Sequence, residues 1–211
     1  MQGHDTAAPE TDPRMQSATD EDLMLQVRDG AGDTLGVLFD RYQAPLFNFY
    51  AKLTGDRGLS EDLVQEVFLR ILRYRQSYRP GTPFRAWVYQ IARNARVDHY
   101  RKTRKETELD PDMPAPKPLV DPAQQEQETA LLHRALQQMP EEKKEILILA
   151  RFQELKYDEI ARLIGCEVAT VRVRVHRALQ ELRQIFRQLE SGAAGPAAGK
   201  QISPRRLGHE V

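Results

Sequence analysis

The chain has 211 residues, of which 40% are hydrophobic and 29% charged, as is usual for a globular protein with one large or two small domains. Its single cysteine, Cys166, excludes an internal disulfide and a cysteine-based metal cage, and no apolar run approaches the roughly 20 residues that a membrane span needs. The formal net charge is zero, and no basic segment followed by an apolar run begins the chain. We therefore expect a cytoplasmic protein without a secretory signal.

The charges are segregated along the chain. Residues 1–24 and 106–130 are strongly acidic, whereas the cations between Thr82 and Lys105 are opposed only by Asp98. A basic segment of this kind predicts a polyanionic partner. Because acidic segments flank it, we also hypothesise that the two halves of the free chain close on each other and weaken binding of this partner.

Helix signals follow a polar N-terminal segment, residues 1–18, that we expect to be disordered. A first helix is predicted to begin at Thr19, whose hydroxyl can cap free amides ahead of three acidic residues, and to end at Gly30. A second helix is predicted from Leu35 to Leu53.

A third helix is predicted to begin at Ser60 and to have two different faces. Its apolar stripe, which we expect to be buried, consists of Leu63, Val64, Val67, Phe68, Ile71 and Leu72. Asp62, Gln65 and Glu66 lie off this stripe, so the helix can pack and still present a polar face.

Residues 83–102, PFRAWVYQIARNARVDHYRK, predict a fourth helix with an apolar arc and an opposite face on which arginines alternate with tyrosines. The members of this opposite face are Arg85, Tyr89, Arg93, Arg96, Tyr100 and Arg104, flanked by Gln90, Asn94 and Arg101. Guanidinium groups neutralise phosphates and aromatic rings stack on unpaired bases, a combination typical of sites for single-stranded nucleic acid. The alternative is that the tyrosines pack on another helix and the arginines are solvated.

Residues 106–128 are acidic and rich in proline, which predicts an extended linker. On both sides of it the apolar residues repeat at helical spacing. We therefore predict an all-α protein with two small helical domains, residues 19–105 and 129–188, and a disordered C-terminal tail, residues 189–211.

The second domain has helix-turn-helix spacing in residues 156–183, KYDEIARLIGCEVATVRVRVHRALQELR. Gly165 fits the turn after a short helix, and the buried stripe of the longer helix is predicted to be Val171, Val175, Ala178 and Leu182. The other side offers Arg172, His176, Arg177, Gln180, Arg183 and Arg187 to phosphates and base edges in a major groove. A plain helical hairpin is the alternative.

Three segments, DLVQEVF, PFRAWVYQIARNARVDHYRK and YDEIARLIGCEVATVRVRVHRAL, resemble in order those of bacterial RNA polymerase sigma factors of the extracytoplasmic-function group. The resemblance covers about Asp20 to Arg187. It implies a sigma region 2 domain, a flexible linker and a sigma region 4 helix-turn-helix domain. It also implies a protein that binds core RNA polymerase, recognises and melts promoter DNA, and is often held inactive by an anti-sigma factor.

The resemblance also implies roles for individual residues. Asp62, Gln65 and Glu66 correspond to the face that docks on the polymerase clamp helices. The residues assigned to the minus-ten element are Tyr78, Arg79, Arg85, Tyr89, Arg93, Asn94, Arg96, Tyr100 and Arg101, with the loop at residues 78–82 matching one that captures a flipped base. Those assigned to the minus-thirty-five element are Thr170, Arg172, Val173, Arg174, His176 and Arg177. Val173 stands where a serine is common in the family, and Leu179 replaces a frequent arginine, so both departures bear on promoter preference.

Other classes of protein explain less of the chain. A helix-turn-helix regulator that acts without core polymerase leaves the arginine–tyrosine helix and the DLVQEVF face without a role. The segment GAGDTLG, residues 30–36, meets neither the Rossmann nor the Walker spacing, and the five histidines are scattered without a metal-binding pattern. We therefore predict no catalytic site, no metal and no cofactor, and we expect Cys166 to pack in the core, with a redox sensor as the alternative.

Overall fold

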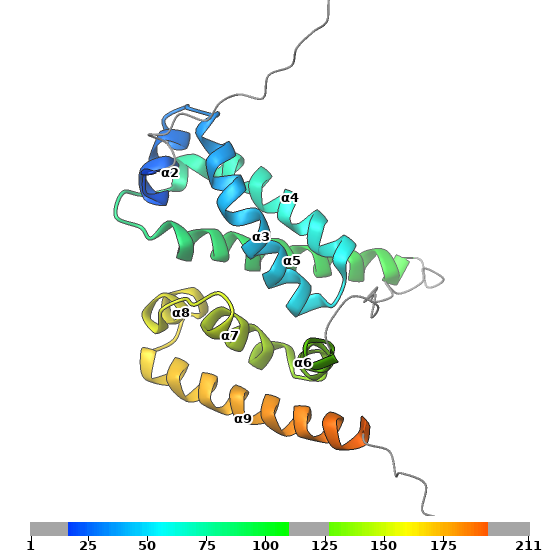
Figure 1. The fold of residues 1–211 in the computed structure, drawn as a ribbon. Helices are drawn as coiled ribbons and strands as arrows, with labels where there is room; N and C mark the ends of the chain where they lie inside the picture. Colours follow the sequence, from blue (N-terminus) through cyan, green and yellow to red (C-terminus); the bar gives the residue numbers. More distant parts are fainter. Residues whose placement is uncertain (1–16, 110–126, 194–211) are drawn as a thin grey trace, which may run out of the picture.

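The computed structural model describes residues 17–109 and 127–193, which form two groups of helices stacked one above the other (Figure 1). The upper group contains α2 (Asp20–Arg28), α3 (Thr34–Thr54), α4 (Arg57–Tyr74), the short 3-10 helix η1 (Arg75–Ser77) and α5 (Phe84–Leu109). The lower group contains α6 (Gln127–Gln137), α7 (Glu141–Arg151), α8 (Tyr157–Ile164) and α9 (Val168–Ala193). The described residues include no strand, so the all-α prediction with two helical domains is confirmed.

The first helix begins where its capping signal predicts. The Thr19 hydroxyl accepts a hydrogen bond from the Asp22 amide at 3.2 Å, which satisfies one of the free donors of the first turn. Gly30, at φ 110°, follows the end of α2. The second predicted helix also lies within one residue of α3 at each end.

The start of α4 differs from the prediction, because the helix begins at Arg57 rather than at Ser60. The carboxylate of Asp56 accepts a hydrogen bond from the Leu59 amide at 3.0 Å and so acts as the N-cap. Ser60 is buried inside the first turns, where its hydroxyl donates to the Asp56 carbonyl at 2.5 Å. Its polar side chain thus satisfies a helix carbonyl instead of starting the helix.

The predicted linker, residues 106–128, overlaps helices at both ends, because α5 continues to Leu109 and α6 begins at Gln127. Its other residues, 110–126, lie outside the described part of the chain, as do most of the two predicted disordered segments. At the C-terminus α9 extends to Ala193, past the predicted domain end at residue 188.

The helix-turn-helix of the lower group is confirmed. Gly165 ends α8 with φ 68°, a left-handed conformation that a residue with a side chain adopts only at a cost. The predicted stripe of α9 is buried, with Val171, Val175 and Ala178 each at most 1% exposed. It packs on α7 and α8, which leaves the opposite side of α9 at the surface.

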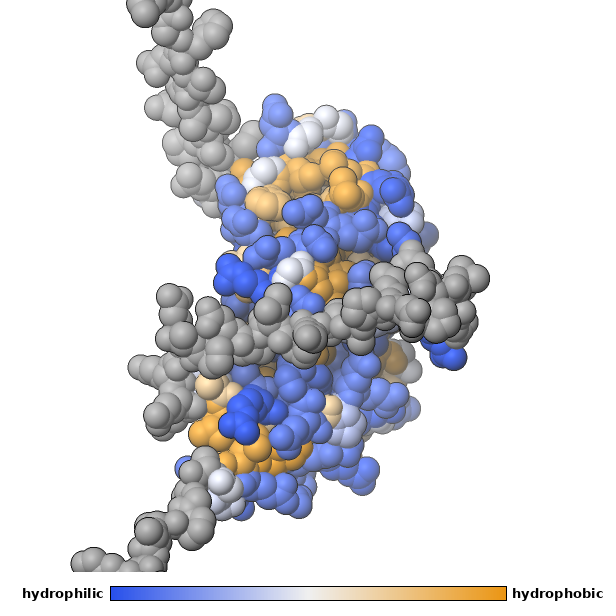
Figure 2. All heavy atoms as spheres, turned by 90° about the vertical axis from the view of Figure 1, so that its right-hand side faces the viewer, coloured by the Kyte–Doolittle hydropathy of each residue, from blue (hydrophilic) through white to orange (hydrophobic). Residues whose placement is uncertain are grey.

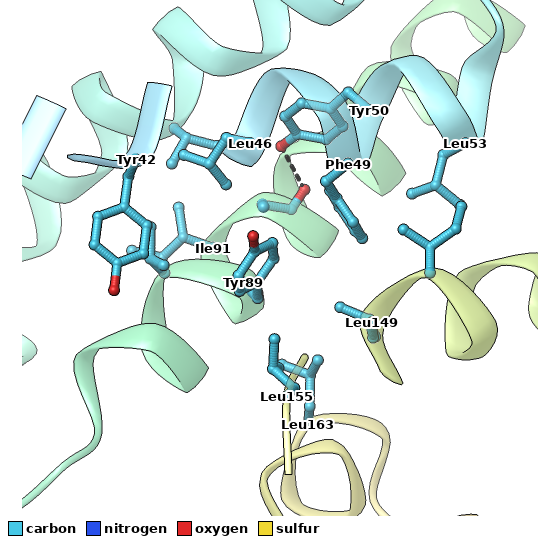
Figure 3. Packing of buried hydrophobic residues seen from close by; sticks show 14 of the residues in the cluster. Tyr42, Leu46, Phe49, Tyr50, Leu53, Tyr89, Ile91, Leu149, Leu155 and Leu163 are labelled. Atoms are coloured by element: carbon cyan, nitrogen blue, oxygen red, sulfur yellow. Dashed lines mark hydrogen bonds between the residues drawn. The ribbon is translucent and has the colours of Figure 1, made fainter. Parts of the chain in front are cut away.

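One layer of buried side chains connects the two groups (Figure 3). Phe49 and Leu53 of α3 and Tyr89 of α5 enter it from above, and Leu149 of α7 and Leu163 of α8 enter it from below. Each large apolar side chain that is fully buried contributes about 1.5–3 kcal/mol relative to its exposed state. The two groups therefore share part of their core.

Candidate nucleic-acid and protein interfaces

The polar face of α4 is at the surface. Asp62 and Gln65 are exposed, and Glu66 is half-buried. Arg70 holds Glu66 in place, because its Nε lies 2.6 Å from a Glu66 carboxylate oxygen while its Nη1 lies 2.7 Å from Asp98. The side chains that DLVQEVF was predicted to present to a partner are therefore accessible.

An apolar side chain stands on the same face and was missed in the sequence. Leu69 is 57% exposed and lies one helical turn beyond Gln65 and Glu66. Its spacing of three and four residues from Glu66 and Gln65 could have placed it on their face of the helix. Leu72, by contrast, was predicted in the buried stripe but is 37% exposed, because it lies at the edge of that stripe.

A groove of about 440 Å³ between α3 and α4 adjoins this face. Phe39, Phe47 and Val64 give it apolar walls, and Gln65 belongs to both the groove and the polar face. Figure 2 shows hydrophobic residues gathered on each of the two helical groups among hydrophilic ones. A partner that binds α4 thus meets apolar as well as polar surface.

The arginine–tyrosine face of α5 is directed at the lower helical group. Arg93 makes a two-pronged ion pair with Glu145 of α7, with N–O distances of 2.8 and 3.3 Å, and donates to the Leu163 carbonyl at 2.8 Å. Arg96 is 6% exposed and pairs with Glu141 and, at 3.8 Å, with Glu145. These arginines are paired with acids rather than solvated.

Tyr89 and Arg85 extend the same contact toward the end of α7. The Tyr89 hydroxyl donates to the side-chain oxygen of Gln153, and Arg85 donates to the backbone carbonyl of the same residue. Tyr89 is fully buried, and this burial raises the pKa of its hydroxyl. The predicted stacking ring therefore packs between the two groups in this conformation.

Two more hydrogen bonds join the groups at the C-terminal end of α3. Lys144 Nζ donates to the Leu53 carbonyl at 2.8 Å, and Gln137 Nε2 donates to the Lys52 carbonyl at 2.9 Å. Burial, followed by the positive charge of Arg96, lowers the pKa of Lys144. A helix that ends in free carbonyls thus receives donors from the other half of the chain.

Other predicted minus-ten residues stay at the surface. Arg79, Asn94, Tyr100 and Arg101 are exposed. The Asn94 side chain accepts a hydrogen bond from Gln90 at 3.1 Å. These residues can contact a ligand without any change in the arrangement of the helices.

Tyr78 has a different environment from the one predicted for a base-contacting residue. It is 2% exposed, packs edge-on against Phe84 and Trp87, and donates through its hydroxyl to the Thr82 carbonyl. Burial raises its pKa to about 12. Tyr78 therefore ties the two ends of the loop at residues 78–82 together, and the loop exposes the neighbouring Arg79 and Pro80.

The predicted minus-thirty-five face of α9 is open to solvent. Arg172, Arg174, His176 and Arg177 are exposed, whereas Thr170 is half-buried. Val173 is 48% exposed and does not pad the helix against a neighbour. In a major groove, the exposed arginines of this face can bind phosphates and base edges, and the exposed valine can contact a base edge.

The described residues also bear on two other kinds of site, a metal centre and a membrane span. Among them, no group of three or more His, Cys, Asp or Glu side chains is arranged to hold a metal ion. None of the helices in this part of the chain is long and apolar enough to cross a bilayer. Cys166 is a free, half-buried thiol that packs against the core of the lower group.

Two family models match the chain, sigma-70 region 2 at residues 38–106 and sigma-70 region 4 at residues 129–182. The RNA polymerase sigma factor CarQ of Myxococcus xanthus is 33% identical over 174 residues, which are 79% of this chain and 97% of CarQ. The ECF RNA polymerase sigma factor SigE of Mycolicibacterium smegmatis is 31% identical over 200 residues, 89% of this chain and 77% of SigE.

Solved structures share the fold. The sigma factor RpoE of Bartonella quintana, crystallised with the anti-sigma factor NepR, has a TM-score of 0.64 at 23% identity, covering 72% of this chain and 96% of RpoE. CnrH in complex with the cytosolic domain of CnrY has a TM-score of 0.63 at 22% identity, covering 80% of this chain and 97% of CnrH.

Proposed function

The chain belongs to the extracytoplasmic-function group of RNA polymerase sigma factors, and from this premise we propose which of its surfaces performs each step of initiation. As a member, it binds core RNA polymerase and directs promoter recognition, DNA melting and the start of transcription. The match to CarQ over 97% of that protein carries this conclusion. A regulator that acts without polymerase is not favoured.

The polar face of α4 is the proposed docking surface for the polymerase clamp helices. Asp62, Gln65 and Glu66 supply polar groups, and Leu69, one helical turn further along, supplies exposed apolar area beside them. Interfaces commonly combine an apolar centre with a polar rim. The groove beside Phe39 lets the contact continue onto α3.

The two DNA readers are proposed to lie on α5 and α9. On α5, Asn94, Tyr100 and Arg101 contact the minus-ten element together with Arg85, Tyr89, Arg93 and Arg96, and the loop at residues 78–82 receives a flipped base. On α9, the exposed cations and Val173 read the minus-thirty-five element in the major groove, as recognition helices do. In this division, residues 19–105 act as region 2, residues 129–188 as region 4, and residues 106–128 as the link between them.

We further propose that the chain acts in the cytoplasm, as a binding factor without a catalytic site, and that an anti-sigma factor controls it. The neighbours of similar fold whose structures were solved in complex with NepR and with the cytosolic domain of CnrY support such a partner.

Reconstituted transcription tests the proposed function. The purified chain is added to core polymerase on genomic DNA, and the initiation sites are mapped. We expect discrete start sites that require both components. Binding of the chain to promoter DNA with the same affinity and sites whether or not core is present, and without new transcripts, would instead identify a regulator.

A further inference from the structure

The contact between α5 and α7 unites opposite charges from the two halves of the chain. Arg93 and Glu145 form an ion pair in which the side chains are only 24% and 10% exposed. Arg96 lies beside the same carboxylate and also reaches Glu141. Two of the arginines that the proposed function assigns to DNA phosphates are thus occupied by the carboxylates of α7.

The charged contact covers one DNA surface and leaves the others open. Tyr89 and Arg85 are held by Gln153 in the same interface. The docking residues Asp62 and Gln65 on α4 remain exposed, as do Arg172 and Arg177 on α9. The closed arrangement therefore blocks part of the minus-ten reader while the polymerase and minus-thirty-five surfaces stay accessible.

The charged contact contributes less to holding the two groups together than its number of ion pairs suggests. Burying paired charges costs desolvation free energy that offsets much of their attraction. The Nε of Arg96 is buried without a hydrogen-bond partner among the described residues, which makes this cost higher. A cleft of about 480 Å³ lined by Arg93, Glu145, Arg174 and Arg177 leaves the edge of the ion pair open to solvent, where salt can screen it.

We propose that α7 is an intramolecular competitor of promoter DNA, in which Glu141 and Glu145 occupy on Arg93 and Arg96 the positions of DNA phosphates. The proposal rests on the proposed function of α5. When the lower helical group leaves α5, the arginines and Tyr89 are released together, because all of them bind the stretch from Glu141 to Gln153, to which Arg93 adds the Leu163 carbonyl of the same group. The minus-ten reader is completed by this separation.

The test uses the full-length chain without polymerase. The double variant Glu141→Gln/Glu145→Gln keeps the side-chain size and removes the two charges. Its matched control is Glu154→Gln/Glu190→Gln, which removes two exposed charges of the same group that lie outside the cleft beside Arg93 and make no ion pair within the described residues. Small-angle X-ray scattering gives the radius of gyration, and fluorescence anisotropy gives the affinity for a labelled single-stranded oligonucleotide of mixed sequence.

We expect the double variant to be more extended than the wild type and to bind the oligonucleotide at least about threefold more tightly. Apparent affinity rises with the fraction of molecules that are competent to bind. The control should change neither quantity beyond the small effect of charge. Circular dichroism of all variants verifies that the helices are intact.

Three results would overturn the proposal, and they differ in meaning. A double variant as compact as the wild type would show that the two carboxylates do not hold the halves together. An extended double variant with unchanged DNA affinity would show that α5 is not the DNA surface, and so would count against the proposed function too. An equal gain in the control would assign the effect to net charge alone.

Discussion

At the scale of single residues, Val173 is the side chain whose chemistry differs most from that of its neighbours on the recognition helix. It has cations on both sides and is nearly half exposed. Its methyl groups offer no hydrogen bond, so the partner that suits them in a major groove is the methyl group of thymine. We therefore expect the valine to favour one base where a serine accepts several.

We expect Val173→Ser to relax or shift the preferred base at one position of the minus-thirty-five element. A single mismatched base pair typically costs about 1–3 kcal/mol, which is large enough to change a selected sequence. Selection of upstream elements from a randomised library, with wild type and variant holoenzyme, measures the change. Identical preferred sequences would mean that Val173 reads no base.

Asn94 is the exposed polar residue in the middle of α5, and we expect Asn94→Ala to impair melting more than docking. Unpaired bases exist only after strand separation, so the loss should appear on duplex promoter DNA and be smaller on a pre-melted promoter. Permanganate footprinting reports the open complex in both cases. Asn48→Ala, at an exposed position of α3, is the control, and wild-type activity of Asn94→Ala on both templates would contradict the prediction.

At the scale of helices, α4 packs on the core with its apolar side, and we propose that it binds polymerase with its polar side. We expect Asp62→Ala, Gln65→Ala and Glu66→Ala to weaken binding to core polymerase, while the free energy of unfolding changes by about 0.5 kcal/mol or less for the two exposed residues. Titration with labelled core and thermal melting measure the two effects. Asp40→Ala, at an exposed site on α3, should leave both unchanged. Unfolding of the variants without a selective binding defect would refute this division.

The turn between α8 and α9 makes a prediction about stability. Gly165→Ala forces a side chain into a left-handed conformation and should destabilise the lower group by about 1–2 kcal/mol, although the space around it is open. Gly36→Ala, within α3 and equally unobstructed, should instead stabilise the chain by about 0.5 kcal/mol. Urea unfolding followed by circular dichroism compares the two, and equal effects would contradict the role of φ.

The start of α2 was predicted correctly from the capping residue Thr19. The turn between α8 and α9 was predicted correctly from Gly165, because glycine is the residue that adopts its backbone conformation most easily. The start of α4 was predicted wrongly at Ser60 instead of after Asp56. Serine and aspartate are equally good capping residues in the sequence, and only the folded chain shows that Ser60 is buried. The periodicity of α5 predicted an apolar face and an arginine–tyrosine face. It did not predict that the arginine–tyrosine face contacts the lower helical group. The pairing of Arg93 with Glu145 depends on how two helical groups pack, and neither spacing nor composition contains that information.

At the scale of the whole molecule, the hypothesis that the two halves close on each other is supported for one DNA surface only. Glu141 and Glu145 of α7 pair with Arg93 and Arg96 of α5, whereas Arg101 of α5 and the cations of α9 remain exposed. We expect raised salt to increase the radius of gyration of the wild type, because ions screen partly exposed pairs. The variant Glu141→Gln/Glu145→Gln should respond much less. A wild-type radius that is independent of salt would argue against an electrostatic contribution to closure.

The donors that Gln137 and Lys144 provide to the end of α3 have a consequence for local order. Lys52 and Leu53 belong to the last turn of that helix, and their carbonyls lose these partners when the halves part. A helix end that loses its capping donors frays, and the positive charge of Lys144 no longer complements the helix dipole there. We therefore expect the last turn of α3 to be better ordered in the closed arrangement, where these two carbonyls are hydrogen-bonded, than after the halves part.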